Sequence, residues 1–87
     1  MNTRYPIYSI KFYAMVPNQR DHASSPKPAF FGVGHADNCR PVDKLWISFD
    51  THFFRVHQLT SDGEAKSYLY KLNDIVGRLE IVEESAP

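Results

Sequence analysis

The sequence predicts a small α+β domain, in which an antiparallel sheet of about four to five strands carries one amphipathic helix on one face. Three observations support this fold class. Residues 7–16 alternate with the period of a strand, residues 44–59 resemble a hairpin, and residues 65–79 repeat apolar side chains at helical spacing. The expected order of elements is ββββαβ. Residues 1–87 are expected to form a single domain, as is usual for a chain of this length.

The first half of the chain is expected to form two strands separated by loops. The first strand covers residues 7–16, and its alternation places five side chains on one side: Tyr8, Ile10, Phe12, Ala14 and Val16. A long polar loop is expected at residues 17–28, where three prolines and a Ser-Ser pair exclude a helix or an internal strand. A short second strand then covers residues 29–35, and a second loop covers residues 36–43.

The second half begins with an expected hairpin. Residues 44–49 and 53–59 form its strands, and the three residues between them form a tight turn. If Phe49 faces Phe53, one side of the hairpin carries Trp46, Ser48, Phe54 and Val56.

A helix is expected after the hairpin. Ser61 and Glu64 fit a capping box at its start. Apolar side chains then recur at spacings of three and four: Ala65, Tyr68, Leu69, Leu72, Ile75, Val76 and Leu79. Gly77 is expected to end the helix, and residues 78–83 to form a short last strand.

The composition limits the function classes. Ten basic side chains balance ten acidic ones, so no net charge directs the chain to nucleic acid or to an anionic membrane. No apolar run is long enough for a membrane span, and the N-terminus does not resemble a secretory signal. Cys39 is the only cysteine, which excludes an intramolecular disulfide and favours the cytoplasm.

One spacing resembles a metal site. His35, Cys39, His52 and His57 follow a zinc-finger pattern with a histidine in place of the first cysteine. On an extended strand, however, positions 52 and 57 point to opposite faces, so the last two histidines do not converge. We therefore expect no metal and no cofactor, and a small zinc-binding domain is the second alternative function.

The sequence gives little support to catalysis. Cys39 has His22 and His35 near it in sequence, but no helix follows it to favour the thiolate. The acidic side chains near the end of the chain lie among other charges, and nothing places one of them in an apolar pocket. We expect a protein that is not an enzyme.

Surplus apolar side chains favour a binding function. One helix covers one sheet face, so Tyr13, Met15 and one side of the hairpin are left for another surface to cover. We expect a non-enzymatic domain that binds another protein as a small inhibitor, adaptor or regulator, of the type that mobile genetic elements encode, and that also forms a homodimer. The expected contact residues are Arg20, Asp21 and His22 in the long loop and Trp46, Phe54 and Arg55 in the hairpin.

A single-stranded nucleic-acid binder is the first alternative. Bases stack on exposed aromatic rings, and the sequence offers five rings for such a platform: Tyr13, Phe30, Phe31, Trp46 and Phe54. Lys11, Lys44 and Arg55 lie among them in sequence. The zero net charge disfavours this alternative, because phosphate binding depends on a concentrated positive field.

Overall fold

The computed structural model describes residues 4–17, 23–37 and 40–84. In these ranges the chain is all-β. It contains strands β1 (Tyr5–Pro17), β2 (Ser24–Gly32), β3 (Ala36–Asp37), β4 (Arg40–Phe49), β5 (Phe53–Thr60), β6 (Ala65–Lys71) and β7 (Ile75–Glu83), with the 3-10 turn η1 (Leu72–Asp74) before β7. The antiparallel sheet has the order β2-β1-β4-β5-β6, with β3 beside β4 and β7 beside β1. No helix in the described part of the chain is long and apolar enough to span a membrane.

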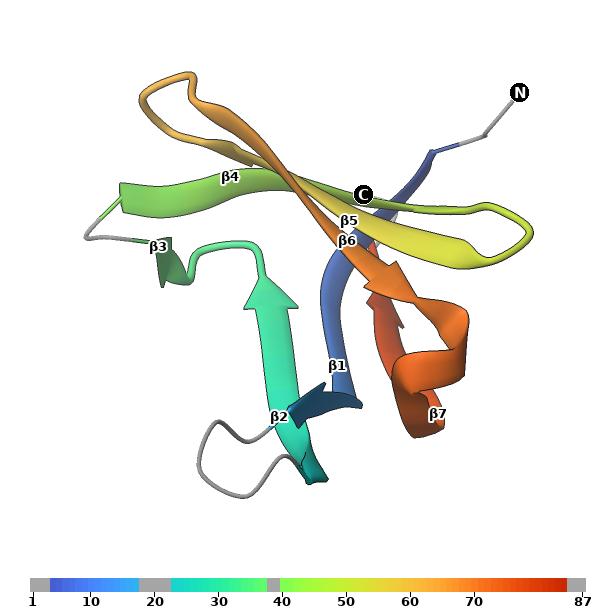
Figure 1. Ribbon diagram of the computed structural model, residues 1–87. Coiled ribbons are helices and arrows are strands. Elements are labelled where there is room, and N and C mark those ends of the chain that lie inside the picture. Colours follow the sequence, from blue (N-terminus) through green and yellow to red (C-terminus); the bar gives the residue numbers. More distant parts are fainter. Residues whose placement is uncertain (1–3, 18–22, 38–39, 85–87) are drawn as a thin grey trace.

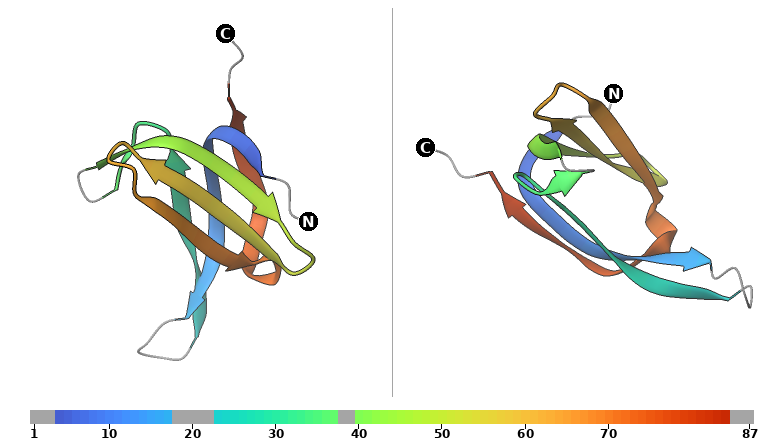
Figure 2. Two further views of the ribbon diagram at one scale, coloured as in Figure 1. Left: turned by 90° about the horizontal axis from the view of Figure 1, so that it is seen from above. Right: turned by 90° about the vertical axis from the view of Figure 1, so that its left-hand side faces the viewer.

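The sheet folds over itself into two layers because β1 belongs to both (Figure 1). Tyr5 and Pro6 pair with β4, which continues through β5 and β6 into what we call the β5 layer. From Ser9 onward β1 runs between β2 and β7, forming the β1 layer. A register shift between Ile7 and Ser9 marks the change. Figure 2 shows that the strands of the two layers cross one another.

The core lies between the layers. Phe12 of β1 makes edge-to-face contacts with Phe54 of β5 and Tyr70 of β6, with ring centroids 5.2 and 4.9 Å apart. The buried cluster consists of Ile7, Ile10, Phe12, Ala14, Leu45, Ile47, Phe54 and Val56. The strand expected at residues 7–16 is thus confirmed, with its central apolar side chains buried. Tyr8 is instead exposed, because the register shift after Ile7 moves it off the buried face.

The expected helix is wrong, and the α+β class with it. Its residues form β6, η1 and β7. In β6 the half-buried side chains are Lys66, Tyr68 and Tyr70, while the residues between them are exposed, which is the period of a strand. Tyr68 and Leu69 satisfy the helical spacing only by chance, since Tyr70 rather than Leu69 packs on the core.

The expected capping box is a hairpin turn between β5 and β6. The N–H of Gly63 donates to the carbonyl of Thr60 over 2.9 Å, and Gly63 has the positive φ of 89° that favours glycine. The carboxylate of Asp62 accepts hydrogen bonds from the Thr60 hydroxyl, the Glu64 N–H and the Arg40 guanidinium. The Thr60 hydroxyl, followed by Arg40, lowers the pKa of Asp62 to about 2.

The expected end of the helix is an irregularity in a strand. Gly77 lies in β7 with a φ of 77°. There the pairing with β1 changes register, because Lys11 faces Glu80 whereas Tyr13 faces Val76. Extra residues in one strand of such a pair form a β-bulge, for which a glycine with positive φ is well suited.

Both expected loops are shorter than residues 17–28 and 36–43, because β1, β2 and β4 extend into them. Pro26 and Pro28 lie in β2, where they are tolerated because β2 pairs only with β1 along this stretch and is an edge strand. The strand expected at 29–35 therefore ends earlier, at Gly32.

The expected hairpin exists as β4 and β5, but its register differs by one residue. Phe49 pairs with Phe54 rather than Phe53, and Ile47 pairs with Val56. A one-residue slip exchanges the two faces of a strand. Phe54 therefore faces the core, and Arg55 and His57 face outward.

Two alanine substitutions distinguish the strand from the helix in β6. Tyr70→Ala removes a ring from the aromatic core and is expected to lower the free energy of unfolding by about 3 kcal/mol. Leu69→Ala, at a side chain 55% exposed, is expected to cost less than about 1 kcal/mol. Chemical denaturation measures both, and a larger loss for Leu69→Ala would contradict this packing.

Candidate functional site

A polar groove lies on the outer face of the β5 layer. Its lining residues come from neighbouring strands: Arg4 precedes β1, Ser48 lies in β4, Arg55 and His57 lie in β5, and Ser67 lies in β6. Ser48 pairs with Arg55 and His57 pairs with Ser67, so these side chains are cross-strand neighbours. The hollow has a volume of about 370 Å³. We call these five residues the polar groove.

His57 connects the two serines of the polar groove. Its Nε2 lies 2.8 Å from the Oγ of Ser48, and its Nδ1 lies 2.8 Å from the Oγ of Ser67. One nitrogen of a neutral imidazole donates a hydrogen bond and the other accepts one. His57 therefore donates to one serine hydroxyl and accepts from the other. These two hydrogen bonds fix the orientation of the imidazole ring and satisfy both nitrogens of a buried side chain.

The electrostatics of the polar groove favour the neutral imidazole. Burial lowers the pKa of His57 from its ordinary value of 6.5, and the positive charges of Arg4 and Arg55 lower it further. Asp50 lies 3.9 Å from the Arg55 guanidinium, at the outer limit of an ion pair. Among the described residues, no carboxylate is within ion-pair distance of Arg4.

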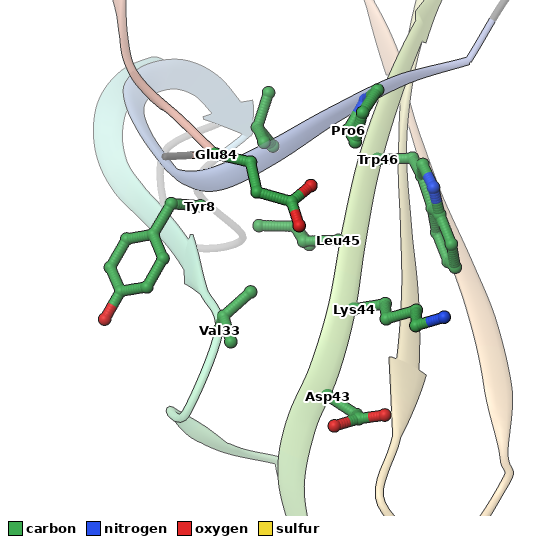
Figure 3. Close-up of a pocket in the computed structure, with 9 residues that line it drawn as sticks. Pro6, Tyr8, Val33, Asp43, Lys44, Leu45, Trp46 and Glu84 are labelled. Carbon is green, nitrogen blue, oxygen red and sulfur yellow. The ribbon is translucent and has the colours of Figure 1, made fainter. Parts of the chain in front are cut away.

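An apolar notch of about 240 Å³ lies where β1 passes from one layer to the other. Its lining includes Pro6, Tyr8, Val33, Leu45 and Glu84. Figure 3 shows the carboxylate of Glu84 beside Leu45, with Val33 nearby, while the ring of Tyr8 is directed away from them at the edge of the notch. The notch can accept an apolar side chain beside a negative charge.

The outer face of the β1 layer carries exposed apolar side chains. Tyr13 lies between Pro28 of β2 and Val76 of β7. The next pair along carries Phe30 beside Lys11. The rings of Tyr13 and Phe30 and the side chain of Val76 are all exposed. An exposed apolar surface with charges at its margin is typical of an interaction site.

The structure separates the expected contact residues. Trp46 pairs with His57, and Arg55 is the next outward residue on β5, so Trp46 and Arg55 share the outer face of the β5 layer. Phe54 is 0% exposed and belongs to the core, so it is not available to a partner. The three loop residues Arg20, Asp21 and His22 lie outside the described part of the chain. Their role in partner binding stays a prediction.

The expected nucleic-acid platform is not a single surface. Phe54 is buried and Phe31 packs against the core. Tyr13 and Phe30 are exposed on the β1 layer, whereas Trp46 lies on the β5 layer. The five rings therefore cannot stack successive bases of one strand.

The histidines of the zinc-like spacing lie in different parts of the fold. His35 packs edge-on against Phe30, with ring centroids 4.5 Å apart, and His52 is exposed in the β4–β5 turn. His57 is hydrogen-bonded to serines, and Cys39 lies outside the described residues. Within the described ranges, no three potential metal ligands gather.

Sequence reasoning did not single out Arg4, Ser48 and Ser67. The strand alternation already places Ser48 on the same side as Trp46, so the position of Ser48 on that face can be predicted from the sequence. The polar groove emerges only when the register of the hairpin is known, because a slip of one residue moves Arg55 and His57 away from Ser48.

Residues 6–83 match the family described as the Enterobacteria phage T3 gene 1.05 protein. The chain belongs to this family. No curated protein and no solved structure matches this chain. The segment that matches the phage T3 gene 1.05 family begins at Pro6 and ends with β7, so it contains both layers and the apolar notch except Glu84. Of the polar groove, only Arg4 lies before it.

The environment of His57 predicts how stability depends on pH. Because its pKa is lowered in the folded state, the unfolded state binds the proton more readily, and the free energy of unfolding is expected to fall as the pH drops below 6.5. Replacing one positive neighbour, in Arg55→Gln, should raise the pKa of His57 toward 6.5. Nuclear magnetic resonance of the imidazole measures the pKa, and an unchanged value would show that Arg55 has no influence there.

Proposed function

We propose that this member of the phage T3 gene 1.05 family is a non-enzymatic protein-binding domain that acts as a small inhibitor, adaptor or regulator, and that its partner docks at the apolar notch. The observation that carries the proposal is the concave apolar lining formed by Tyr8, Val33 and Leu45. Interface hot spots are side chains that fill such pockets, and tyrosine and tryptophan are enriched among them.

The notch also indicates the chemistry of its partner. Asp43, Lys44 and Glu84 are the charged residues of its lining, which gives a net negative charge. The partner that fits best presents an apolar side chain next to a lysine or arginine. The apolar contact supplies affinity, and the opposite charges favour one orientation of the two proteins.

Two further observations support the biological context. The family is described by a phage gene product, which agrees with a regulator of mobile-element type. The single cysteine supports the reducing cytoplasm as the place of action.

The notch can be tested by comparing two exposed aromatic residues. Tyr8→Ala removes a notch ring that is 50% exposed, and Phe49→Ala removes a ring that is 40% exposed at the distant end of β4. Tyr8→Ala is expected to weaken partner binding by about 1–3 kcal/mol, whereas Phe49→Ala retains the affinity of the unchanged protein. Thermal melts establish that both variants fold.

The measurement is affinity capture from host lysate with quantitative mass spectrometry, at low and high salt and with nuclease. We expect one protein to be captured at both salt concentrations and lost only with Tyr8→Ala. Equal capture by the two variants would remove the notch as the contact site. Loss on nuclease treatment would favour the nucleic-acid alternative.

We propose in addition that two copies associate through the outer face of the β1 layer. Tyr13, Phe30 and Val76 are the apolar centre of that face. A mutual contact there would remove this surface from water and enlarge the core that a chain of 87 residues can form.

Light scattering coupled to size exclusion tests this association. The unchanged protein is expected to have twice the mass of the 10.0 kDa chain. Tyr13→Lys places a charge at the centre of the contact and should give the monomer mass, while Leu69→Lys on the other layer leaves the dimer intact. A monomer mass for the unchanged protein over micromolar to hundred-micromolar concentrations would exclude the dimer.

A further inference from the structure

We propose that the polar groove binds a phosphate group. The groove combines two arginines, a histidine and two serines, and no carboxylate is among its lining residues. This site lies on the outer face of the β5 layer and shares no lining residue with the apolar notch.

Guanidinium groups are the first reason for this assignment. Arg40 is paired with Asp62 and Glu64, and Arg78 is paired with Glu80. Among the described residues, Arg55 has one ion-pair partner, Asp50 at 3.9 Å, and Arg4 has none. Two cations that share one hollow repel each other, and an anion between them removes this repulsion. Arginine also presents paired N–H donors that match the oxygens of phosphate.

The hydroxyl groups are the second reason. One serine accepts the hydrogen bond that His57 donates, so the hydrogen of that serine hydroxyl is available to another acceptor. The groove therefore offers a neutral donor in addition to the two positive ones. Phosphate has enough oxygens to accept from all three, and a hollow of about 370 Å³ leaves room for a group attached to it.

Cross-strand register gives the site its rigidity. Ser48 with Arg55, and His57 with Ser67, are direct partners in adjacent strands of one layer. Ser48 and His57 are buried to 2% and 8% exposure, so their positions are set by packing as well as by hydrogen bonds. Donors held on a sheet lose little freedom when an anion binds.

Titration of the full chain with inorganic phosphate tests the proposal. Sodium chloride holds the ionic strength constant, and nuclear magnetic resonance follows the backbone amides and the imidazole of His57. We expect saturable shifts at the groove residues and a rise in the pKa of His57, because a bound anion stabilises the imidazolium. Phosphate that produces no saturable shift at these residues would overturn the proposal.

Charge-neutral variants then locate the site. Arg4→Gln and Arg55→Gln should each weaken phosphate binding by about tenfold, the loss expected for one charge-assisted hydrogen bond. The matched control is Arg78→Gln, which removes a positive charge outside the groove and should leave binding unchanged. An equal loss in the control would show that general attraction, and not the groove, holds the anion.

Two more titrations separate this site from the apolar notch and identify the source of the phosphate. Tyr8→Ala should bind phosphate as the unchanged protein does, even if the notch has no partner. A nucleoside monophosphate and a short single-stranded oligonucleotide then compete for the groove. Tighter binding of the monophosphate assigns the site to small phosphorylated molecules, and tighter binding of the oligonucleotide assigns it to a nucleic-acid backbone.

Discussion

Strand β1 forms backbone hydrogen bonds in both layers, and the rest of the fold depends on this double pairing. Tyr5 and Pro6 pair with β4, and the residues from Ser9 onward pair with β2 and β7. Because one continuous strand makes both sets of bonds, the β5 layer must cross over the β1 layer. The crossing brings Phe12 against Phe54 and Tyr70. The apolar notch lies beside Pro6 and Tyr8, where β1 leaves one layer for the other.

A sheet that covers itself explains how the described residues form a core without an α-helix. The strands of both layers turn apolar side chains toward the space between the layers, and these side chains meet there without another element. Aromatic rings suit this arrangement because strands that cross leave irregular spaces, which large planar side chains fill. Phe31 illustrates the point, since its ring lies 5.0 Å from Tyr68 and 6.3 Å from Phe12, linking an edge strand to both layers.

The sequence predicts the strands better than it predicts their partners. Alternation over residues 7–16 is a local signal, and the structure confirms that strand. From Ala65 to Leu72 the apolar positions fit both periods, and only contact with Phe12 selects Tyr70 over Leu69 as the buried residue. The hairpin shows the same limit, because its turn lacks the glycine that would define the register. Trp46 and Arg55 were therefore predictable as surface residues, while the burial of Phe54 was not.

The same register that buries Phe54 creates the arrangement of charges outside. Moving β5 by one residue would exchange Phe54 with Arg55, so the core and the polar groove are two faces of one pairing. On the core face of β5, Phe54 and Val56 are stabilised by packing against the other apolar side chains of the core. The groove face is different, because burial lowers the pKa of His57 and the positive charges of Arg4 and Arg55 lower it further. Asp50 lies 3.9 Å from Arg55, whereas Arg4 has no ion pair with a described residue, so the repulsion between the two guanidinium groups is only partly offset. The packing of β5 does not require the two arginines to share one groove, and this arrangement supports the phosphate site that we propose.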